Sequence, residues 1–303
     1  DLRYGENPHQ KAGLYSFGNI NDKSLVGANI FQGKELSYNN FLDANTAMRC
    51  SQEFNDPCCV IVKHVNPCGV AISDNITNAY EKAFETDPES AFGGVIAVNR
   101  AVDENFATKL ISNQFVEVII APDYDAEALE VFKQKNNIRV ISVKGYKKNR
   151  IDFQIQSIDG GFLVQEDDDK MITKDDLNCV TEKKPNQDEI ADLMFAWTVA
   201  KYVKSNAIVF AKNRQTIGIG AGQMSRVNSA KIASLKAANA NLDTTDAVMA
   251  SDGFFPFSDS IEMASDNGIN CIIQPGGSIK DQEVIDEANK KDIAMVLTGM
   301  RHF

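Results

Sequence analysis

The adjacent residues Lys63 and His64 have side chains suited to proton transfer and to stabilising negative charge. They lie near the end of an apolar run over residues 58–65, which predicts a buried strand, and residues 66–69 (NPCG) are typical of a turn. An imidazole can accept a proton near neutral pH, and a neighbouring ammonium favours its neutral form. Ionisable groups are costly in an apolar strand unless something uses them. The pair indicates a catalytic base with a cationic helper, although a solvated pair at the end of a surface strand has the same sequence.

Three glycine-rich stretches, at residues 92–94, 218–222 and 276–278, could approach a phosphate or a flat ring closely. The Gly-x-Gly-x-Gly string at 218–222 does not match the dinucleotide-binding fingerprint. Its spacing differs, and no acidic residue follows a second strand at the required distance. All three stretches are predicted as turns, and spacing alone favours a structural role for each.

Two further segments combine residue types that often contact ligands. Residues 3–10 (RYGENPHQ) are rich in hydrogen-bonding side chains, and a frayed terminus is the alternative interpretation. Residues 251–259 (SDGFFPFSD) place aromatic rings between acidic side chains. Such a segment could be a stacking platform for an aromatic ligand, or core packing beside a turn.

The sequence cluster of Cys58, Cys59, His64 and Cys68 raises the question of a metal site. It contains no Cys-x-x-Cys pair, and adjacent cysteines on a strand point to opposite faces of the sheet. The sequence therefore predicts no metal here. Six cysteines scattered through a long chain are typical of reduced cytosolic thiols.

The elements that must position these side chains follow from apolar patterning. Residues 58–65 and 270–274 are predicted as central strands of a parallel sheet, where ligands collect at the carboxyl ends of strands. The similarity of these two strand–Pro–Gly units hints weakly at a duplication. Further strands are predicted at residues 94–99, 117–121, 138–143, 207–211 and 295–298. Helices are predicted at residues 40–54, 75–86, 190–204, 258–267 and 281–291, which gives an α/β class.

Length and charge limit the remaining possibilities. A chain of 303 residues exceeds the usual size of one core, so two lobes are expected, with a boundary in the polar stretch 165–188 or a surface excursion there. The formal net charge of −11 argues against nucleic-acid or anionic-membrane partners, but a local cluster of cations could still bind a small anion. Because the first residue is Asp, the chain is expected to be a fragment or a processed product.

Taken together, these segments resemble the transformylase portion of bifunctional purine-biosynthesis proteins. The matching stretches lie throughout the chain: residues 2–10 (LRYGENPHQ), 60–71 (VIVKHVNPCGVA), 89–97 (ESAFGGVIA), 115–122 (FVEVIIAP), 204–208 (KSNAI), 217–227 (IGIGAGQMSRV), 251–257 (SDGFFPF), 274–279 (QPGGSI) and 300–303 (MRHF).

The resemblance implies formyl transfer from 10-formyltetrahydrofolate to aminoimidazole carboxamide ribonucleotide. It implies an α/β fold of duplicated cytidine-deaminase-like α/β/α lobes, at residues 1–184 and 185–303. The first carries the Lys-His strand, and the second carries folate-side and C-terminal binding residues. It also implies a cytoplasmic homodimer with active sites at the interface. No tightly bound cofactor is implied, although some relatives have a monovalent cation, potassium, near Asp252. The family's cyclohydrolase domain would precede this chain and is absent from it.

The resemblance also implies roles for individual residues, with His64 as proton acceptor and Lys63 as its support. Positions that match the nucleotide site are Arg3, Tyr4, Gly93, Glu117, Asn206, Phe254 and Arg301. Glu117 is an Asp in some relatives, so its role carries over less directly. Positions that match the folate side are Arg226, Asp259, Ser278 and Ile279.

Two other classes of function remain open from the sequence. A deaminase-like hydrolase on the same fold would need zinc, which the missing Cys-x-x-Cys opposes. A non-catalytic nucleotide-binding fragment is the other alternative, and the intact Lys63-His64 pair opposes it.

Overall fold

The computed structural model describes residues 1–16, 20, 22–144 and 153–303. In chain order its elements are η1 (Leu25–Gly27), β1 (Asn29–Gln32), α1 (Tyr38–Gln52), β2 (Cys58–Lys63), β3 (Asn66–Ile72), α2 (Ile76–Thr86), α3 (Pro88–Ala91), β4 (Gly94–Val98), α4 (Glu104–Asn113), β5 (Val116–Ala121), α5 (Ala126–Phe132), β6 (Arg139–Ser142), β7 (Phe153–Ile158), β8 (Gly161–Glu166), η2 (Lys174–Asp176), β9 (Asn178–Cys179), α6 (Gln187–Ala200), β10 (Ile208–Lys212), β11 (Gln215–Gly220), α7 (Arg226–Asn239), β12 (Val248–Ser251), α8 (Asp259–Asp266), β13 (Cys271–Gln274), α9 (Asp281–Lys290) and β14 (Ala294–Leu297).

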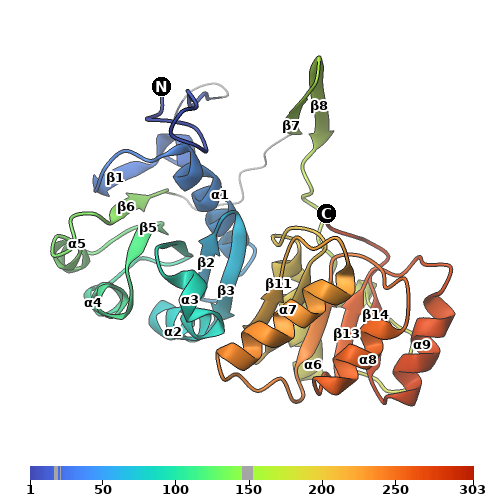
Figure 1. The fold of residues 1–303 in the computed structure, drawn as a ribbon. Helices are drawn as coiled ribbons and strands as arrows, with labels where there is room; N and C mark the ends of the chain where they lie inside the picture. The colour runs from blue at the N-terminus through green and yellow to red at the C-terminus, as the bar shows by residue number, and fades with distance from the viewer. Residues whose placement is uncertain (17–19, 21, 145–152) are drawn as a thin grey trace.

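One mixed sheet runs through both halves of the chain (Figure 1). Within the described residues its twelve strands lie in the order β1-β6-β5-β4-β2-β3-β11-β10-β12-β13-β14-β9. In the first half β2 is antiparallel to β3 and β4, and β4, β5 and β6 are parallel. In the second half β10 is antiparallel to β11 and β12, and β12, β13 and β14 are parallel. The two halves therefore share one strand order and one pattern of directions, which confirms the α/β class.

This repeat corrects the sequence comparison that hinted at a duplication. The predicted equivalence was between residues 58–69 and 270–278, but the strand order matches β2 with β10, and β13 with β5. Glycine and proline in the two stretches made them look alike. What repeats is the order and direction of the strands, and the local composition of a segment does not reveal either.

The strand at residues 58–65 is shorter than predicted, and it is not part of a parallel ladder. β2 ends at Lys63, and the residues predicted as a turn, 66–69, begin strand β3. His64 and Val65 both have positive φ, of 52° and 63°, and close a two-residue hairpin loop in which Lys63 pairs with Asn66. Positive φ at both central positions suits the right-handed twist of the flanking strands. The Pro-Gly composition was therefore misleading here.

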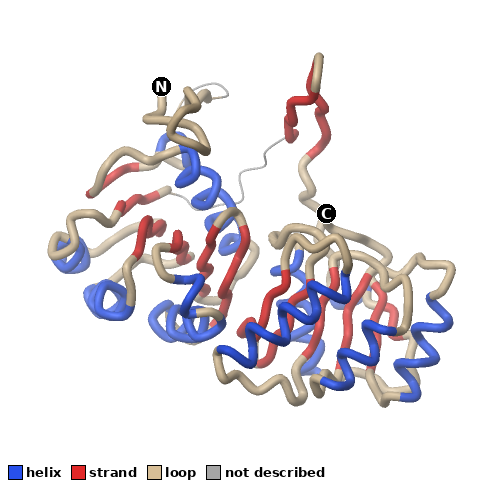
Figure 2. Tube along the Cα trace, viewed as in Figure 1, coloured by secondary structure: helices blue, strands red, loops and turns tan. Residues whose placement is uncertain are grey.

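Within the part of the chain that the structure describes, three buried clusters fill the space between the sheet and its helices. Alternate residues of β2 enter different clusters, with Cys58 and Val60 on one face and Cys59 and Ile61 on the other. One cluster joins α1 and α6 to one face of the whole sheet, α2, α4 and α5 cover the other face in the first half, and α7, α8 and α9 cover it in the second. The strands between two helical layers are visible in the second half of Figure 2. The result is a three-layer α/β/α arrangement.

The glycines predicted as a turn at 218–222 are partly strand. Gly218 and Gly220 belong to β11, where a Cβ atom would overlap the backbone carbonyl oxygens of Ala233 and Ser229 in α7. Gly69 in β3 meets Ala83 of α2 in the same way. These glycines allow a helix to approach its strand closely. Only Gly222, with φ of 68°, lies in the loop that follows.

The other predicted elements agree with the structure to within a few residues, apart from α6. That helix begins at Gln187, three residues before its predicted start, and ends at Ala200 rather than Lys204. Its C-terminal half is buried on all sides, including Trp197, so it is a core helix more than an amphipathic one. Among the described residues, no helix combines the length and apolar composition required to cross a bilayer.

Candidate active site

Strand directions bring the predicted site residues to one edge of the sheet. The edge holds the carboxyl ends of β2, β11, β12, β13 and β14 and the amino ends of β3, β4, β5 and β10. In the second half this is the carboxyl edge of parallel strands, as expected. In the first half the parallel strands β4 and β5 run the opposite way, so Lys63 lies beside their amino ends. The parallel-strand rule was therefore wrong for the Lys63-His64 pair itself.

Lys63 is positioned by the loop that precedes β4. Its Nζ donates a hydrogen bond of 2.6 Å to the carbonyl oxygen of Phe92. The next residue, Gly93, has φ of 68° and donates its N–H to Phe115 at 2.8 Å. A methyl group added at Gly93 would lie 3.4 Å from Lys63 Nζ. One of the three ammonium donors is thus used for positioning, and two are free of that task.

His64 sits in the β2–β3 turn and exposes its ring to solvent. Helix α1 fixes the turn through a hydrogen bond. Asp43 Oδ1 in α1 accepts this bond from the Val65 N–H at 2.6 Å. Burial raises the pKa of Asp43, while the Val65 hydrogen bond and the nearby charges of His64 and Lys63 oppose the shift. The carboxyl group therefore orients the turn without occupying the solvent face of the imidazole.

Asn66 connects this turn to the second half of the chain. Its side-chain oxygen accepts the N–H of Lys204 at 3.0 Å, and its amide nitrogen donates to the carbonyl oxygen of His64 at 3.0 Å. Two residues beyond Lys204, Asn206 bonds through its Nδ2 to the carbonyl oxygen of Gln223 at 2.7 Å. The His64 turn and the loop containing Lys204 and Asn206 are therefore joined by a direct hydrogen bond.

Arg226, the first residue of α7, is the hub of a polar network. Its guanidinium donates to Asn206 Oδ1, to Ser251 Oγ and to Asp252 Oδ1, each at 2.7 Å. Burial lowers the pKa of Arg226, and the Asp252 carboxylate opposes that shift. Three of the five donors are engaged internally, which leaves two N–H groups for a ligand.

The Asp252 carboxylate is fully buried at the end of β12. One oxygen pairs with Arg226, but Oδ2 has no hydrogen-bond partner among the described residues. A buried, unpartnered carboxylate oxygen is unfavourable and calls for an explanation. It marks a position where an additional cationic or donor group would be stabilised.

The chain's last residues lie against this network. The His302 N–H donates to the Asp252 carbonyl oxygen at 3.3 Å, and the exposed Arg301 guanidinium lies 4.4 Å from the ring centroid of Phe303. Phe303 in turn approaches Gly253, where a Cβ atom would come within 3.2 Å of its ring. Phe254 leaves 40% of its surface exposed beside this segment. A cation and aromatic rings thus face solvent above the Asp252 carboxylate.

A cavity of about 390 Å³ opens between the ends of β10, α7 and α8. Its lining includes Asn206, Arg226, Phe257 and Asp259. The Phe257 ring is half exposed and lies 4.6 Å from Lys280 Nζ. Two residues predicted for the folate side and one predicted for the nucleotide therefore share one cavity.

The remaining predicted residues lie elsewhere along the edge. Arg3 is exposed and stacks 5.5 Å from the ring of Tyr4, in a terminal loop closed by a Leu2–Ala12 bridge rather than frayed. Glu117 in β5 forms a 2.7 Å ion pair with Arg139. The loop after β13 is the predicted turn. There Ser278 Oγ caps the N–H of Lys280 at 3.1 Å, and Ile279 is fully exposed.

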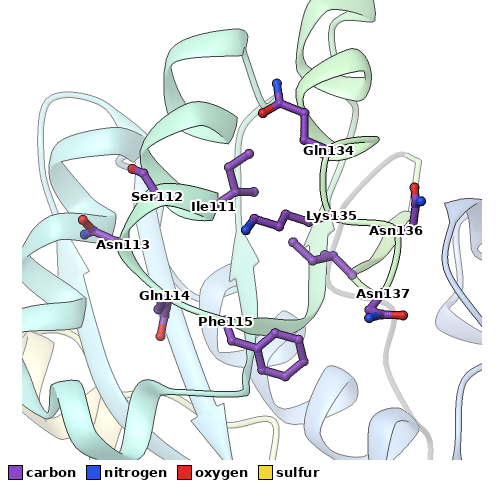
Figure 3. A pocket seen from close by; sticks show the side chains of 10 residues that line it. Ile111, Ser112, Asn113, Gln114, Phe115, Gln134, Lys135, Asn136 and Asn137 are labelled. Carbon is purple, nitrogen blue, oxygen red and sulfur yellow. The ribbon is translucent and has the colours of Figure 1, made fainter.

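A second cavity, of about 460 Å³, lies at the amino ends of β5 and β6 (Figure 3). Amide side chains line its rim and Lys135 reaches into it, as Figure 3 shows. Phe115 joins it to the edge that holds Lys63, because its carbonyl oxygen accepts a hydrogen bond from the Gly93 N–H and its ring lines the cavity. None of the predicted site residues lines this cavity.

The sheet separates Cys58 from Cys59 and Cys68, the other cysteines near Lys63 and His64. Cys58 and Cys59 belong to clusters on opposite faces, as adjacent strand residues should. Burial raises the pKa of Cys59 strongly and that of Cys68 to about 12, so these thiols stay protonated near neutral pH. Cys68 packs on the same cluster as Cys59, and among the described residues no three His, Cys, Asp or Glu side chains gather into a group that could hold a metal ion.

Asp43 and Asn66 are site residues that sequence reasoning missed as functional. Asp43 lies within helix α1, and Asp has a low helix propensity. This low propensity is the one local indication in the sequence that Asp43 has a role beyond forming the helix. Asn66 was predicted only as part of a turn. The contacts that give both residues their roles join segments far apart in sequence.

The chain is therefore an α/β protein with one continuous mixed sheet. Polar and cationic side chains gather along one edge of that sheet and form the candidate site. The family model described as AICARFT/IMPCHase bienzyme matches residues 1–236 of this 303-residue chain. The chain belongs to the AICARFT/IMPCHase bienzyme family.

Proposed function

We propose that this chain catalyses the transformylase reaction of its family. In that reaction a formyl group moves from 10-formyltetrahydrofolate to aminoimidazole carboxamide ribonucleotide. The observation that carries the proposal is the exposed His64 beside a Lys63 anchored on Phe92, in a turn tied through Asn66 to the loop of Asn206. A base and a cation held together are what acyl transfer to a weak amine requires.

The proposed mechanism uses the two side chains at different atoms. The nucleotide's amine is a poor nucleophile because its lone pair is delocalised towards the carboxamide. As its nitrogen bonds to the formyl carbon, His64 takes its proton, and the formyl oxygen gains negative charge that Lys63 stabilises. The bond from the formyl carbon to the folate nitrogen then breaks, and that nitrogen receives a proton, from Lys63 or His64. The products are the formylated nucleotide and tetrahydrofolate.

Substrate contacts are assigned to the exposed groups on the same edge. Arg3 and Arg301 are exposed guanidiniums that would pair bidentately with the phosphate, and Phe254 would face the imidazole ring. Tyr4, Gly93, Glu117 and Asn206 complete the nucleotide side of the proposal. The folate would use the cavity lined by Arg226 and Asp259, with Ser278 and Ile279 near the loop after β13.

The proposal extends to architecture and partners. The repeated strand order supports two cytidine-deaminase-like lobes, at residues 1–184 and 185–303, in a cytoplasmic homodimer with sites at the interface. No tightly bound cofactor takes part. The unpartnered Asp252 Oδ2 fits a monovalent cation such as potassium, which would neutralise it and act in structure rather than chemistry.

One assay tests the proposal and separates it from the family's cyclohydrolase activity. The purified chain should consume 10-formyltetrahydrofolate only when the aminoimidazole nucleotide is present, and the formylated nucleotide should accumulate without ring closure. Closure of added formylated nucleotide to the purine, without consumption of the folate, would assign the chain to the other activity. Release of ammonia from the nucleotide would instead indicate the deaminase-like alternative.

A further inference from the structure

His302 is a buried residue between two exposed ones, Arg301 and Phe303, beside the candidate site. Only 2% of its surface is exposed, whereas Phe303 leaves 70% of its surface exposed. Burial of the His302 ring therefore directs the side chains on either side of it towards solvent. The place at which the Arg301 guanidinium meets a ligand depends on how His302 is fixed.

Three contacts fix His302 to the body of the molecule. Its ring Nδ1 lies 2.5 Å from Asp168 Oδ2, and an ionised carboxylate only accepts hydrogen bonds, so the imidazole donates this one. Its backbone N–H donates to the carbonyl oxygen of Asp252 at 3.3 Å. The ring also packs on the buried Trp197 of α6, with ring centroids 5.2 Å apart. Both the side chain and the backbone of His302 are thus attached to other parts of the fold.

Asp168 is itself anchored through the residue before it. The Asp168 side chain is 40% exposed, whereas the Asp167 side chain is 5% exposed. Asp167 forms an ion pair with Arg49 of α1 and accepts a 2.9 Å hydrogen bond from Gln154. Two consecutive carboxylates therefore connect α1, in the first half of the chain, with His302 in the second half. A residue that supports a binding group is effective only when its own partners are fixed in this way.

Arg301 depends on this support because its own contacts are weak. Its guanidinium lies 4.4 Å from the ring centroid of Phe303, and within the described residues no carboxylate forms an ion pair with it. Phe303 packs against Gly253, where a Cβ atom would come within 3.2 Å of the ring. A long side chain loses conformational freedom when it binds a ligand, and a backbone that is already fixed lowers that cost.

We propose that His302 is a positioning residue for Arg301. By attaching the backbone of residues 301–303 to its three partners, it presents the guanidinium to the nucleotide phosphate. The inference rests on the proposed function only in taking Arg301 as the phosphate contact. His302 touches neither substrate in this arrangement, so its loss should weaken nucleotide binding and leave turnover at saturating nucleotide unchanged. The loss of affinity also cannot exceed the loss caused by removing the Arg301 guanidinium itself.

The first test removes the Asp168–His302 hydrogen bond from either side. His302→Phe keeps an aromatic ring against Trp197 but has no donor, and Asp168→Ala removes the acceptor and leaves the imidazole in place. Calorimetric titration with the aminoimidazole nucleotide, without folate, should give a dissociation constant about fivefold or more higher in both variants. Asp175→Ala removes an exposed carboxylate of η2 and should stay within about twofold. If the far-ultraviolet spectrum shows that His302→Phe does not fold, Asp168→Ala decides alone.

Steady-state kinetics and a double variant separate positioning from a purely structural role. The KM for the nucleotide should rise in His302→Phe, while kcat changes by less than about twofold. His302→Phe combined with Arg301→Ala should bind the nucleotide as Arg301→Ala alone does, because His302 acts only through that guanidinium. An unchanged dissociation constant in a folded His302→Phe or Asp168→Ala, a fall in kcat as large as the loss of affinity, or additive losses in the double variant overturns the proposal.

Failure of the proposed chemistry gives a different result. If the variants bind the nucleotide with the expected losses but the unmodified chain transfers no formyl group, the proposed reaction is wrong and the positioning of Arg301 stands. If Arg301→Ala binds the nucleotide with unchanged affinity, the phosphate contact lies elsewhere. The positioning role then falls together with that contact, while formyl transfer by the unmodified chain is unaffected.

Discussion

The turn at His64 combines a constraint on the backbone with freedom of the ring. Positive φ at His64 and Val65 directs the imidazole outward, while Asp43 takes the Val65 N–H and Asn66 takes the Lys204 N–H. Left-handed conformations are uncommon for non-glycine residues, and surrounding contacts must maintain them. The side chain that would exchange a proton is therefore held by groups that leave its solvent face open.

Removing the base should separate chemistry from binding. His64→Ala is expected to lower turnover by about 10²–10⁴, the usual contribution of a general base, with nucleotide and folate binding changed much less. Lys63→Met should also lower turnover, because it removes positive charge where the formyl oxygen becomes negative. Single-turnover kinetics with separate binding titrations measure both effects. Near-normal turnover in His64→Ala would assign the proton transfer to another group.

The Lys63-His64 pair could be proposed as a site from the sequence, but the residues that hold it in place could not. Lys63 and His64 are adjacent, so their chemistry is visible in the sequence itself. Asp43 and Asn66 act through hydrogen bonds to Val65 and Lys204, and these partners meet only after α1 and the second half have packed. Arg226 was predicted as a ligand contact, and the structure adds that three of its donors are engaged internally.

The Asp168–His302 pair should make stability depend on pH at the acid end. Burial raises the pKa of Asp168, but the His302 hydrogen bond and charge, with Lys201 and Arg49, hold it below its usual value. Because the folded-state pKa is the lower one, this stabilisation is present above about pH 4 and is lost as the pH falls further. Asp168→Asn should therefore unfold at a lower temperature than the unmodified chain at neutral pH, and the difference should shrink below pH 4.

The matched control for that prediction is Asp176→Asn. The pKa of Asp176 is also lowered, by backbone and side-chain hydrogen bonds from Thr173, but the group is exposed and its hydrogen-bond partner lies outside the C-terminal segment. Asp176→Asn should change how the melting temperature depends on pH at acid pH, without affecting the C-terminal segment. Limited proteolysis that releases the last residues in Asp168→Asn alone would locate the effect at His302. An equal release in both variants would contradict it.

At the scale of elements, three glycines set the distance between a helix and its strand. Gly69 faces Ala83, Gly218 faces Ala233, and Gly220 faces Ser229, each across a backbone carbonyl that a Cβ atom would overlap. Replacing any of the three glycines with Ala should lower the free energy of unfolding by about 1–3 kcal/mol or more. Urea denaturation measures the change.

Gly161→Ala is the control, because no atom lies within 4 Å of a Cβ built there and its φ is not positive. It should stay within about 0.5 kcal/mol of the unmodified chain. If Gly69→Ala were equally neutral, α2 would be able to move away from β3 at little cost. Close packing of the helix on the strand would then not require glycine at these positions.

Element prediction succeeded where apolar runs were bounded by clear breaks, as at β4, β5, β13, β14, α8 and α9, whereas β12 and the helices α4, α5 and α7 were not predicted. It failed where glycine or proline lies inside a strand, at residues 66–69 and 218–220, because composition indicates a turn while tertiary packing requires a small residue. The hairpin β7–β8 was not predicted at all. Its alternation of apolar and polar residues is short, and the polar residues that follow it masked the signal.

At the scale of the whole molecule, the repeated strand order places related edges of the two halves side by side. The pairing of β3 with β11 joins the halves, and the N–H of Ile72 donates to Arg214 at 3.0 Å across the junction. The His64 turn lies in one half, and Arg301 lies at the C-terminal end of the other. Both groups sit on one edge, where a second copy could bring them into a common site.

A shared site predicts complementation between differently altered chains. Arg301→Ala should weaken nucleotide binding by about 1–3 kcal/mol, the range for a charge-assisted hydrogen bond, without altering the melting temperature. If His64 and Arg301 of one site come from different copies, mixing His64→Ala with Arg301→Ala chains gives mixed dimers that each hold one intact site. Random pairing should then restore about a quarter of the activity at low nucleotide concentration.

The control for complementation mixes two chains altered on the same side of the site, His64→Ala with Lys63→Met. Every site in that mixture has a defect in the catalytic turn, so activity should stay at the average of the two variants. If neither mixture rises above its components, each site draws His64 and Arg301 from a single chain.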